Sequence, residues 1–225
     1  MEMRMQLSDS TLKILSNFAT VNANMVLKPG QQLKTISEAK NILATADIVE
    51  DFPKEMGIYD LNEFLSIHGL VENPTLDFEE NAVLIKDGSN KVRYFFAQPS
   101  ILTTPDKDIT MPDTEVQVHF TEESLMRIKK AASVLGHIDF SIEGGSDVVA
   151  KVYDAKDSSA NTFELNLGQN TSGFNYNFVM NISNLKLIDG AYDVFISSKL
   201  ISKWENKTVP VNYFIALEKT STFNV

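Results

Sequence analysis

The stretch KVRYFFAQP, Lys91–Pro99, has a counterpart in VPVNYFIALE, Val209–Glu218. Both contain the pattern V-x-Y-F-[FI]-A, and the two copies lie 119 residues apart in a chain of 225 residues. Aromatic and β-branched residues predominate in each copy, which is typical of a β-strand. Two similar strands can arise by chance. A recurrence at half the chain length indicates an internal repeat if other segments recur in the same order.

A helical segment recurs in the same way. Leu7–Val26 resembles Phe120–Asp139 at an offset of 113 residues, and each has a cluster of Ser, Thr and acidic residues typical of a helix N-terminus. Apolar residues follow at helical spacing and predict the buried stripe of each helix. They are Leu12, Leu15 and Ala19 in the first segment, flanked by Ile14 and Phe18, and Leu125, Ile128, Ala132 and Leu135 in the second.

A third pair of segments completes the repeat. Ile58–His68 resembles Met180–Ile188 at an offset of 121 residues, and both predict short helices that are followed by strands. Three matched blocks in the same order predict an α+β fold made by tandem duplication, with two helices packed on an antiparallel sheet in each domain. The predicted domains are residues 1–105 and 106–225, with a linker rich in Pro, Thr and Asp at about 99–113.

The composition narrows the class of function. The chain has no Cys, which excludes disulfides and thiolate catalysis and fits a reducing, cytosolic setting. No apolar run approaches the ~20 residues that span a bilayer, and the N-terminus lacks the apolar stretch of a signal peptide. Phosphate-binding loops, dinucleotide fingerprints and nucleophile elbows are missing, and the isolated His68, His119 and His137 lack partners at metal-site spacing. We therefore expect a protein that is not an enzyme, without catalytic residues, metal, cofactor or membrane association.

The acidic excess of the chain is unevenly distributed. Thirty acidic and twenty basic residues give a net charge of −10, which repels nucleic acid unless positive charge is concentrated locally. Three of the four predicted helices keep neutral or basic residues off their apolar stripes, whereas carboxylates crowd into segments such as 47–51, 77–80 and 106–113. The cations on these helix faces are Lys13, Arg127, Lys129, Lys130 and Lys186.

Each of these faces, taken singly, is better explained as a solvated helix surface. Taken together, they predict a surface that faces the phosphates of DNA and reads no sequence, because backbone contacts carry no base information. Lys129 is the weakest candidate because it lies nearest its apolar stripe.

Nearly the whole chain, from Leu7 to about Thr220, resembles the sliding clamps of T4-like bacteriophages, which are processivity factors of phage DNA polymerases. The residues before Gln6 and the tail Ser221–Val225 match poorly. The resemblance is carried by LKILSNFATVNANMVLKPGQ (12–31), IYDLNEFLSIHGLV (58–71), FNYNFVMNISNLKLIDGAYDV (174–194) and VNYFIALE (211–218).

The resemblance implies two clamp-type domains per subunit and a homotrimer closed head-to-tail into a ring around duplex DNA. It also implies that the clamp tethers the phage DNA polymerase and that a separate ATP-driven clamp loader opens the ring. A role in late transcription with the host RNA polymerase is implied as well, all in the cytoplasm of an infected bacterium. Family members dock partner peptides in an apolar pocket near the linker. The candidates for this pocket are Ile101, Leu102 and Leu217, which can equally well pin the linker to the core.

Two other classes of function stay open from the residues alone. An acidic, duplicated, β-rich chain also suits a virion component or a protein-interaction scaffold without a DNA role. An enzyme with two related domains is the third possibility, and the missing catalytic motifs disfavour it.

Overall fold

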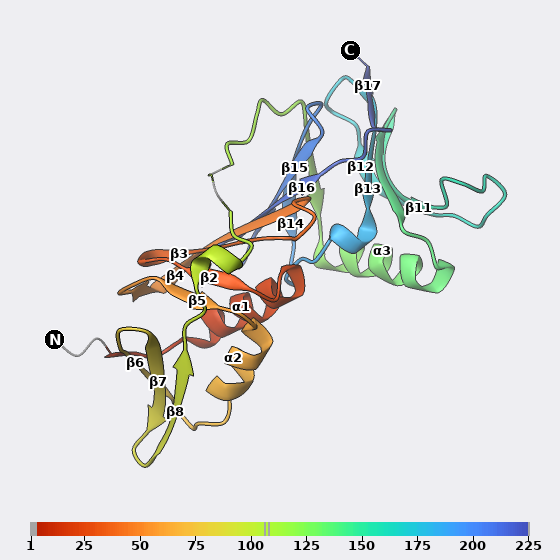
Figure 1. The fold of residues 1–225 in the computed structure, drawn as a ribbon. Helices are drawn as coiled ribbons and strands as arrows, with labels where there is room; N and C mark the ends of the chain where they lie inside the picture. The colour runs from red at the N-terminus through yellow and green to blue at the C-terminus, as the bar shows by residue number, and fades with distance from the viewer. Residues whose placement is uncertain (1–3, 106, 108, 225) are drawn as a thin grey trace. The chain divides into compact units, whose positions relative to one another are not determined.

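In the computed structural model, which describes residues 4–105, 107 and 109–224, the chain divides into two units (Figure 1). The first unit comprises residues 1–108 and 209–211, and the second comprises residues 109–208 and 212–225. The structure thus has a division near residue 108, inside the linker that the sequence predicts.

The described parts of both units follow the same order of elements, except that a 3-10 turn in the second unit stands in the place of the second helix of the first. The first unit has β1 (Arg4–Met5), α1 (Asp9–Val21), β2 (Met25–Leu27), β3 (Gly30–Ile36), β4 (Ile42–Phe52), β5 (Met56–Ile58), α2 (Leu61–His68), β6 (Thr75–Phe78), β7 (Ala82–Asp87) and β8 (Asn90–Phe95), followed by the 3-10 turn η1 (Pro99–Ile101). The second has β9 (Val116–Phe120), α3 (Glu122–Leu135), β10 (Asp139–Gly144), β11 (Asp147–Tyr153), β12 (Phe163–Gln169), β13 (Asn175–Asn181), the 3-10 turn η2 (Ile182–Asn184), β14 (Tyr192–Ser197), β15 (Ile201–Asn206) and β16 (Val211–Ala216), with β17 (Thr222–Asn224) added at the end.

The strand pairing is repeated as well. β1, β6, β7 and β8 form an antiparallel sheet in that order, and β9, β14, β15 and β16 pair in the same way. β2 pairs with β5 and β3 with β4, just as β10 pairs with β13 and β11 with β12. The two stretches KVRYFFAQP and VPVNYFIALE contain the equivalent strands β8 and β16. The predicted α+β fold with a tandem duplication is confirmed.

The core of the second unit is an aromatic cluster. Trp204 and Tyr192 are fully buried, with ring centroids 6.2 Å apart, and Phe120 lies 5.3 Å from Trp204. The polar atoms of this cluster are satisfied, as burial requires. The Trp204 indole donates to Ser202 Oγ (3.0 Å), and the Tyr192 hydroxyl donates to the Ile188 carbonyl (2.6 Å).

The fourth predicted helix, Met180–Ile188, is wrong in extent, because the structure has only the single 3-10 turn η2 there. Asn181 accepts a hydrogen bond from Ser183 N (2.9 Å), and Leu185 already leaves the helical region with φ −78° and ψ 55°. Ile188 is then held at both its N–H and its carbonyl by Tyr213 and Tyr192. So short a helix is marginal in isolation, and these tertiary anchors override its weak helical pattern.

The buried stripe of α1 is also displaced from the prediction. Ile14, Leu15 and Phe18 are at most 1% exposed, whereas Leu12 lies at the edge of the buried face. The larger Ile14 and Phe18 side chains bury more apolar area than Leu12 and Ala19 alone, which turns the helix toward them. In α3 the predicted Leu125, Ile128 and Ala132 are buried and Leu135 is half-buried.

Candidate nucleic-acid interface

Helix α1 carries Lys13 on its exposed face. The helix begins after Ser8, whose side chain accepts a hydrogen bond from Thr11 N (3.3 Å), as an N-cap residue does. Lys13 lies off the buried stripe of Ile14, Leu15 and Phe18, so the packing of α1 leaves its ammonium in solvent. The structure therefore places Lys13 as predicted from the sequence, on a helix surface that a ligand can reach.

A carboxylate from β4 anchors the start of this helix. Glu50 is only 8% exposed and accepts hydrogen bonds from Ser8 N and from the Thr11 hydroxyl. Burial alone would raise the pKa of Glu50, but the hydrogen bonds from Thr11 and Ser8 outweigh it and hold the pKa below its ordinary value. Ionised Glu50 thus satisfies free N–H and O–H donors at the positive end of the helix dipole.

We expect Glu50 to make folding sensitive to acid. Because its pKa is lower in the folded chain than in the unfolded chain, its contribution is complete above the ordinary value of 4.5 and is lost as the pH falls through the folded-state value. Glu50→Gln should lower the free energy of unfolding by about 1–2 kcal/mol at neutral pH and by less at pH ~3. Urea unfolding at the two pH values, at one protein concentration, measures this. An identical loss at both would show that the ionised carboxylate contributes nothing.

Helix α3 presents a second pair of exposed cations. It begins after Thr121, whose side chain accepts a hydrogen bond from Ser124 N (3.1 Å), and it ends at Gly136 in the left-handed region (φ 70°). Arg127 and Lys130 are exposed and three residues apart, which places them on one face of the helix. Glu123, four residues before Arg127, is exposed on the same face.

Lys129 and Lys186 are less accessible than the sequence suggests. Lys129 is half-buried and, with Asp189, lines a small hollow between α3 and the segment after η2. Desolvation lowers its pKa, and the nearby Asp189 only partly offsets this effect. Lys186 is also half-buried and follows η2 instead of lying on a helix. The turn η2 lies next to α3 (Figure 1).

Helix α2 lies beside α1 (Figure 1). Its exposed face differs from that of α1 in the charge of its side chains. Asp60 caps it by accepting hydrogen bonds from Asn62 N (2.9 Å) and Glu63 N (3.4 Å), and its exposed face shows Asn62, Glu63 and Ser66. None of these three exposed side chains is a cation.

The three residues suggested for a partner pocket differ in exposure. Ile101 is 64% exposed, whereas Leu102 is 9% exposed and packs on Gly57, where an added Cβ would lie 3.2 Å from Leu102 Cδ1. Leu217 is buried in the second unit, and its N–H donates to the Leu200 carbonyl (2.9 Å). Leu102 therefore pins the linker to the first unit, and only Ile101 offers an apolar surface to solvent.

The histidines show no shared site. His119 Nδ1 lies 2.9 Å from Asp193 Oδ1, and His137 Nε2 lies 2.9 Å from the Asn161 carbonyl. His68 is buried, and its Nε2 has no hydrogen-bond partner among the described residues. Over residues 4–105, 107 and 109–224, no cluster of three His, Asp or Glu side chains could hold a metal, and no helix is long and apolar enough to cross a membrane.

Comparison with known proteins shows which family has this sequence and fold. The family described as "DNA polymerase processivity factor" matches residues 8–97, and "gp45 sliding clamp, C terminal" matches residues 113–219. The chain is 33% identical to the sliding clamp of Vibrio phage KVP40 over 95% of this chain and 99% of the relative. It is 29% identical to the sliding clamp of Enterobacteria phage T4, over 97% of this chain and 99% of the relative. Proliferating cellular nuclear antigen from Entamoeba histolytica is 12% identical, with a TM-score of 0.69 over 96% of this chain and 98% of that chain.

The structural similarity shows that the duplicated unit has the fold of the DNA clamps. The sequence similarity, which extends over nearly the whole length of the phage relatives, is more specific. The chain belongs to the sliding clamp family of phage DNA polymerase processivity factors.

Proposed function

We propose that three copies of this chain close into a ring around duplex DNA and hold the replicative DNA polymerase on its template. The supporting observation is the charge of the helix faces. A chain with a net charge of −10 exposes Lys13, Arg127 and Lys130 there, clear of the apolar core. We propose Lys129 and Lys186 as secondary contacts with DNA, because both are half-buried.

So few cations give weak attraction to DNA. Each phosphate that a lysine or arginine neutralises releases about one counterion, which favours binding only slightly. The acidic residues elsewhere on the chain repel the DNA. A ring that cannot dissociate without opening retains DNA by its closed topology, while weak contacts let it slide. The small number of exposed cations thus suits a mobile clamp better than a tight DNA-binding protein.

Retention on DNA of different topology tests this function. After loading with clamp loader and ATP, we expect the protein to stay on nicked circular DNA through gel filtration. It should be lost after the circle is cut once with a restriction enzyme, because the ring then slides off the ends. Equal retention on circular and linear DNA, or loss from both, would contradict encirclement.

We propose that the ring closes through the free edges of β8 and β12. Both are terminal strands of their sheets, and each belongs to a different unit, so pairing them between copies is head-to-tail. Exposed apolar side chains lie near both edges. Phe95 on β8 is 64% exposed, Tyr59 is 65% exposed, and Val134 on α3 is 76% exposed. Val134 borders a hollow of about 430 Å³ together with Phe163 at the start of β12.

We propose Ile101 as the apolar contact for a partner peptide at the linker, with Leu102 as its buried support in the first unit. The burial of Leu102 makes Ile101→Asp the informative variant, because Leu102→Asp would bury a charge and destabilise the first unit. Loss of polymerase stimulation by Ile101→Asp, with retention on circular DNA intact, supports this contact.

We further propose that the protein has no catalytic activity of its own and acts in the cytoplasm of the infected bacterium. A separate ATP-dependent loader opens the ring, and the clamp also serves late transcription with the host RNA polymerase. The resemblance to T4-like phage clamps supports these roles.

A further inference from the structure

In the second unit, the edge of β13 is covered by the short strand β17 (Figure 1). β17 pairs with only three residues of β13, 175–177, although β13 has seven residues. Further along the edge, the Val179 N–H donates to the Ser221 hydroxyl (2.9 Å), and the Val179 carbonyl accepts from Glu218 N (2.7 Å). A side chain thus takes the place of a strand backbone at Val179, and a longer strand can pair with more of this edge.

An aromatic side chain anchors β17. The Phe223 ring centroid lies 5.0 Å from that of Phe174 and 6.2 Å from that of Phe178, on which it is stacked. Phe178 is buried, whereas Phe223 is half-buried. We call Phe174 and Phe178 the aromatic slot. The slot suits a phenyl ring, because such a ring buries a large apolar area and adds favourable ring contacts.

The first unit covers the equivalent edge with its linker. Strand β5 corresponds to β13, and its Gly57 carbonyl accepts a hydrogen bond from Ala97 N (2.8 Å), just as Val179 accepts from Glu218. Leu102, five residues after Ala97, packs on Gly57, and the aromatic anchor of β17 likewise lies five residues after Glu218. The two units therefore cover the same edge in the same way with segments of different sequence.

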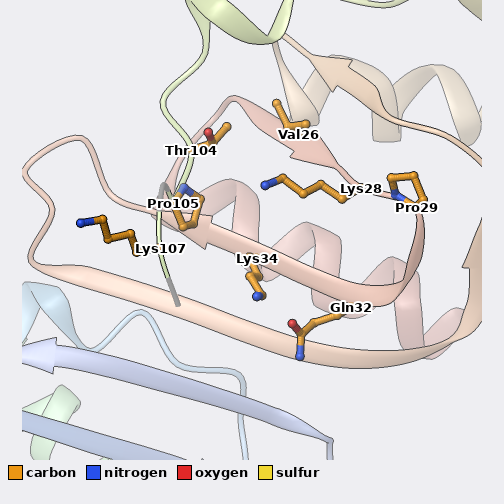
Figure 2. Close-up of a pocket in the computed structure, with 8 residues that line it drawn as sticks. All are labelled: Val26, Lys28, Pro29, Gln32, Lys34, Thr104, Pro105 and Lys107. Carbon is orange, nitrogen blue, oxygen red and sulfur yellow. The ribbon is translucent and has the colours of Figure 1, made fainter. Parts of the chain in front are cut away.

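The linker is held firmly where it continues beyond this edge. The Asn22 side chain donates to the Thr103 carbonyl (3.4 Å), and Thr103 N donates to Asn24 Oδ1 (2.9 Å). The linker then borders a pocket of about 320 Å³ beside β2 and β3 (Figure 2). β17 is held by three paired residues, one side-chain hydroxyl and one phenyl ring. Because ordering a segment costs backbone entropy, contacts of this kind leave β17 the easier of the two segments to displace.

We propose that the edge of β13 and the aromatic slot dock an extended segment of a replication protein that carries an aromatic residue. β17 covers this site until the segment displaces it. The chemistry of the occupant is that of β17 itself, an extended Thr-Phe-Asn with its ring in the slot. A strand added to a sheet edge gains affinity from main-chain hydrogen bonds, and a side-chain pocket gives selectivity.

The docked segment is compatible with the ring. β12 and β17 lie at opposite edges of the same five-stranded sheet, so a segment on β13 leaves β12 free for the proposed contact between copies. The assignment to a replication protein rests on the proposed function as a clamp.

Two labelled synthetic peptides test the site. One has the sequence of residues 218–225, and the other has Ala at the position of Phe223. Ser221→Ala and Phe223→Ala each loosen β17, and Thr222→Ala, at an exposed position of the same strand, is the matched control. We expect the Phe peptide to bind both loosened variants about tenfold more tightly than the intact protein or the control, because more molecules have an open site. The Ala peptide should bind none of them measurably.

Ser221→Ala keeps the ring contacts of Phe223, so it decides the result if urea unfolding shows that Phe223→Ala destabilises the second unit. Equal binding of the Phe peptide by intact, control and loosened proteins would overturn the covering role of β17. Equal binding of the two peptides would overturn the aromatic slot. Assemblies larger than a trimer that form with the intact protein and not with Phe223→Ala would assign the site to the tail of a second copy instead.

Primer extension with Ser221→Ala connects the site to replication. Saturating Phe peptide should shorten the products, whereas the Ala peptide should not, and retention of the clamp on circular DNA should be unchanged. Products of unchanged length would overturn the docking of a replication protein. Loss of the intact protein from circular DNA without any peptide would contradict the clamp function, whereas the peptide binding still decides the chemistry of the site.

Discussion

Arg127→Glu combined with Lys130→Glu is expected to shorten primer extension on a long template about tenfold or more, with loader and polymerase present. Both side chains are exposed on one face of α3, and three copies of the chain would turn six cations into six carboxylates. Each lost phosphate contact removes one increment of counterion release, and each new carboxylate repels the backbone. The defect should be largest above ~0.1 M salt, where the remaining surface attraction is screened.

The matched control for this double variant is Lys156→Glu with Lys219→Glu. Both lysines are exposed, lie outside α3 and change the net charge of the chain by the same amount. Light scattering must show that the ring persists, because Arg127 and Lys130 also border the hollow next to Val134. Extension as long as that of the unmodified protein at every salt concentration would remove both residues from the DNA-facing surface. A ring that falls apart would assign them to the contact between copies.

Phe95→Glu is expected to break the ring into monomers at micromolar concentration. Phe95 is 64% exposed near the end of the edge strand β8, where the proposed contact with β12 of another copy would cover it. The substitution removes the apolar area that the phenyl group of Phe95 would bury in the interface, and it places an unpaired carboxylate there. We expect the dissociation constant of each contact to rise about a hundredfold or more. Light scattering over a range of concentrations measures this.

Val49→Glu is the control for Phe95→Glu. Val49 is 76% exposed on β4, so the same charge is added at a similarly exposed apolar position away from β8. We expect this variant to remain a ring and to stay on circular DNA. A stable trimer of Phe95→Glu would show that β8 is not part of the contact. Dissociation of both variants would point to a general effect of charge and not to this edge.

The duplication could be predicted from the sequence because it depends on local patterns. The strands β8 and β16, the helices α1 and α3, and the order of the segments between them all follow from the spacing of apolar and aromatic residues. The exposure of Lys13, Arg127 and Lys130 was predictable for the same reason. Successive residues of a helix are rotated by a fixed angle, so the distance in sequence from the apolar stripe determines whether a side chain faces the solvent. The clamp resemblance also required only the order and spacing of residues along the chain.

Other features depend on contacts between segments that are far apart in sequence. The segment after Met180 has the apolar spacing of a short helix, but Ile188 follows a different path because its carbonyl accepts from the Tyr192 hydroxyl and its N–H donates to the Tyr213 hydroxyl. Lys129 has a helix-surface position, yet the segment that carries Asp189 covers it.

The clearest case is strand β17 on the edge of β13, which no repeat or motif of the sequence indicates. It forms because Phe223 meets the ring of Phe178 and the Ser221 hydroxyl meets the backbone of Val179, which are distant from it in sequence. The sequence by itself therefore determined the repeated elements and their exposed faces, because periodicity is a property of neighbouring residues. The tertiary structure alone decided which faces are covered and which charges meet, because these depend on packing between segments that no local pattern records.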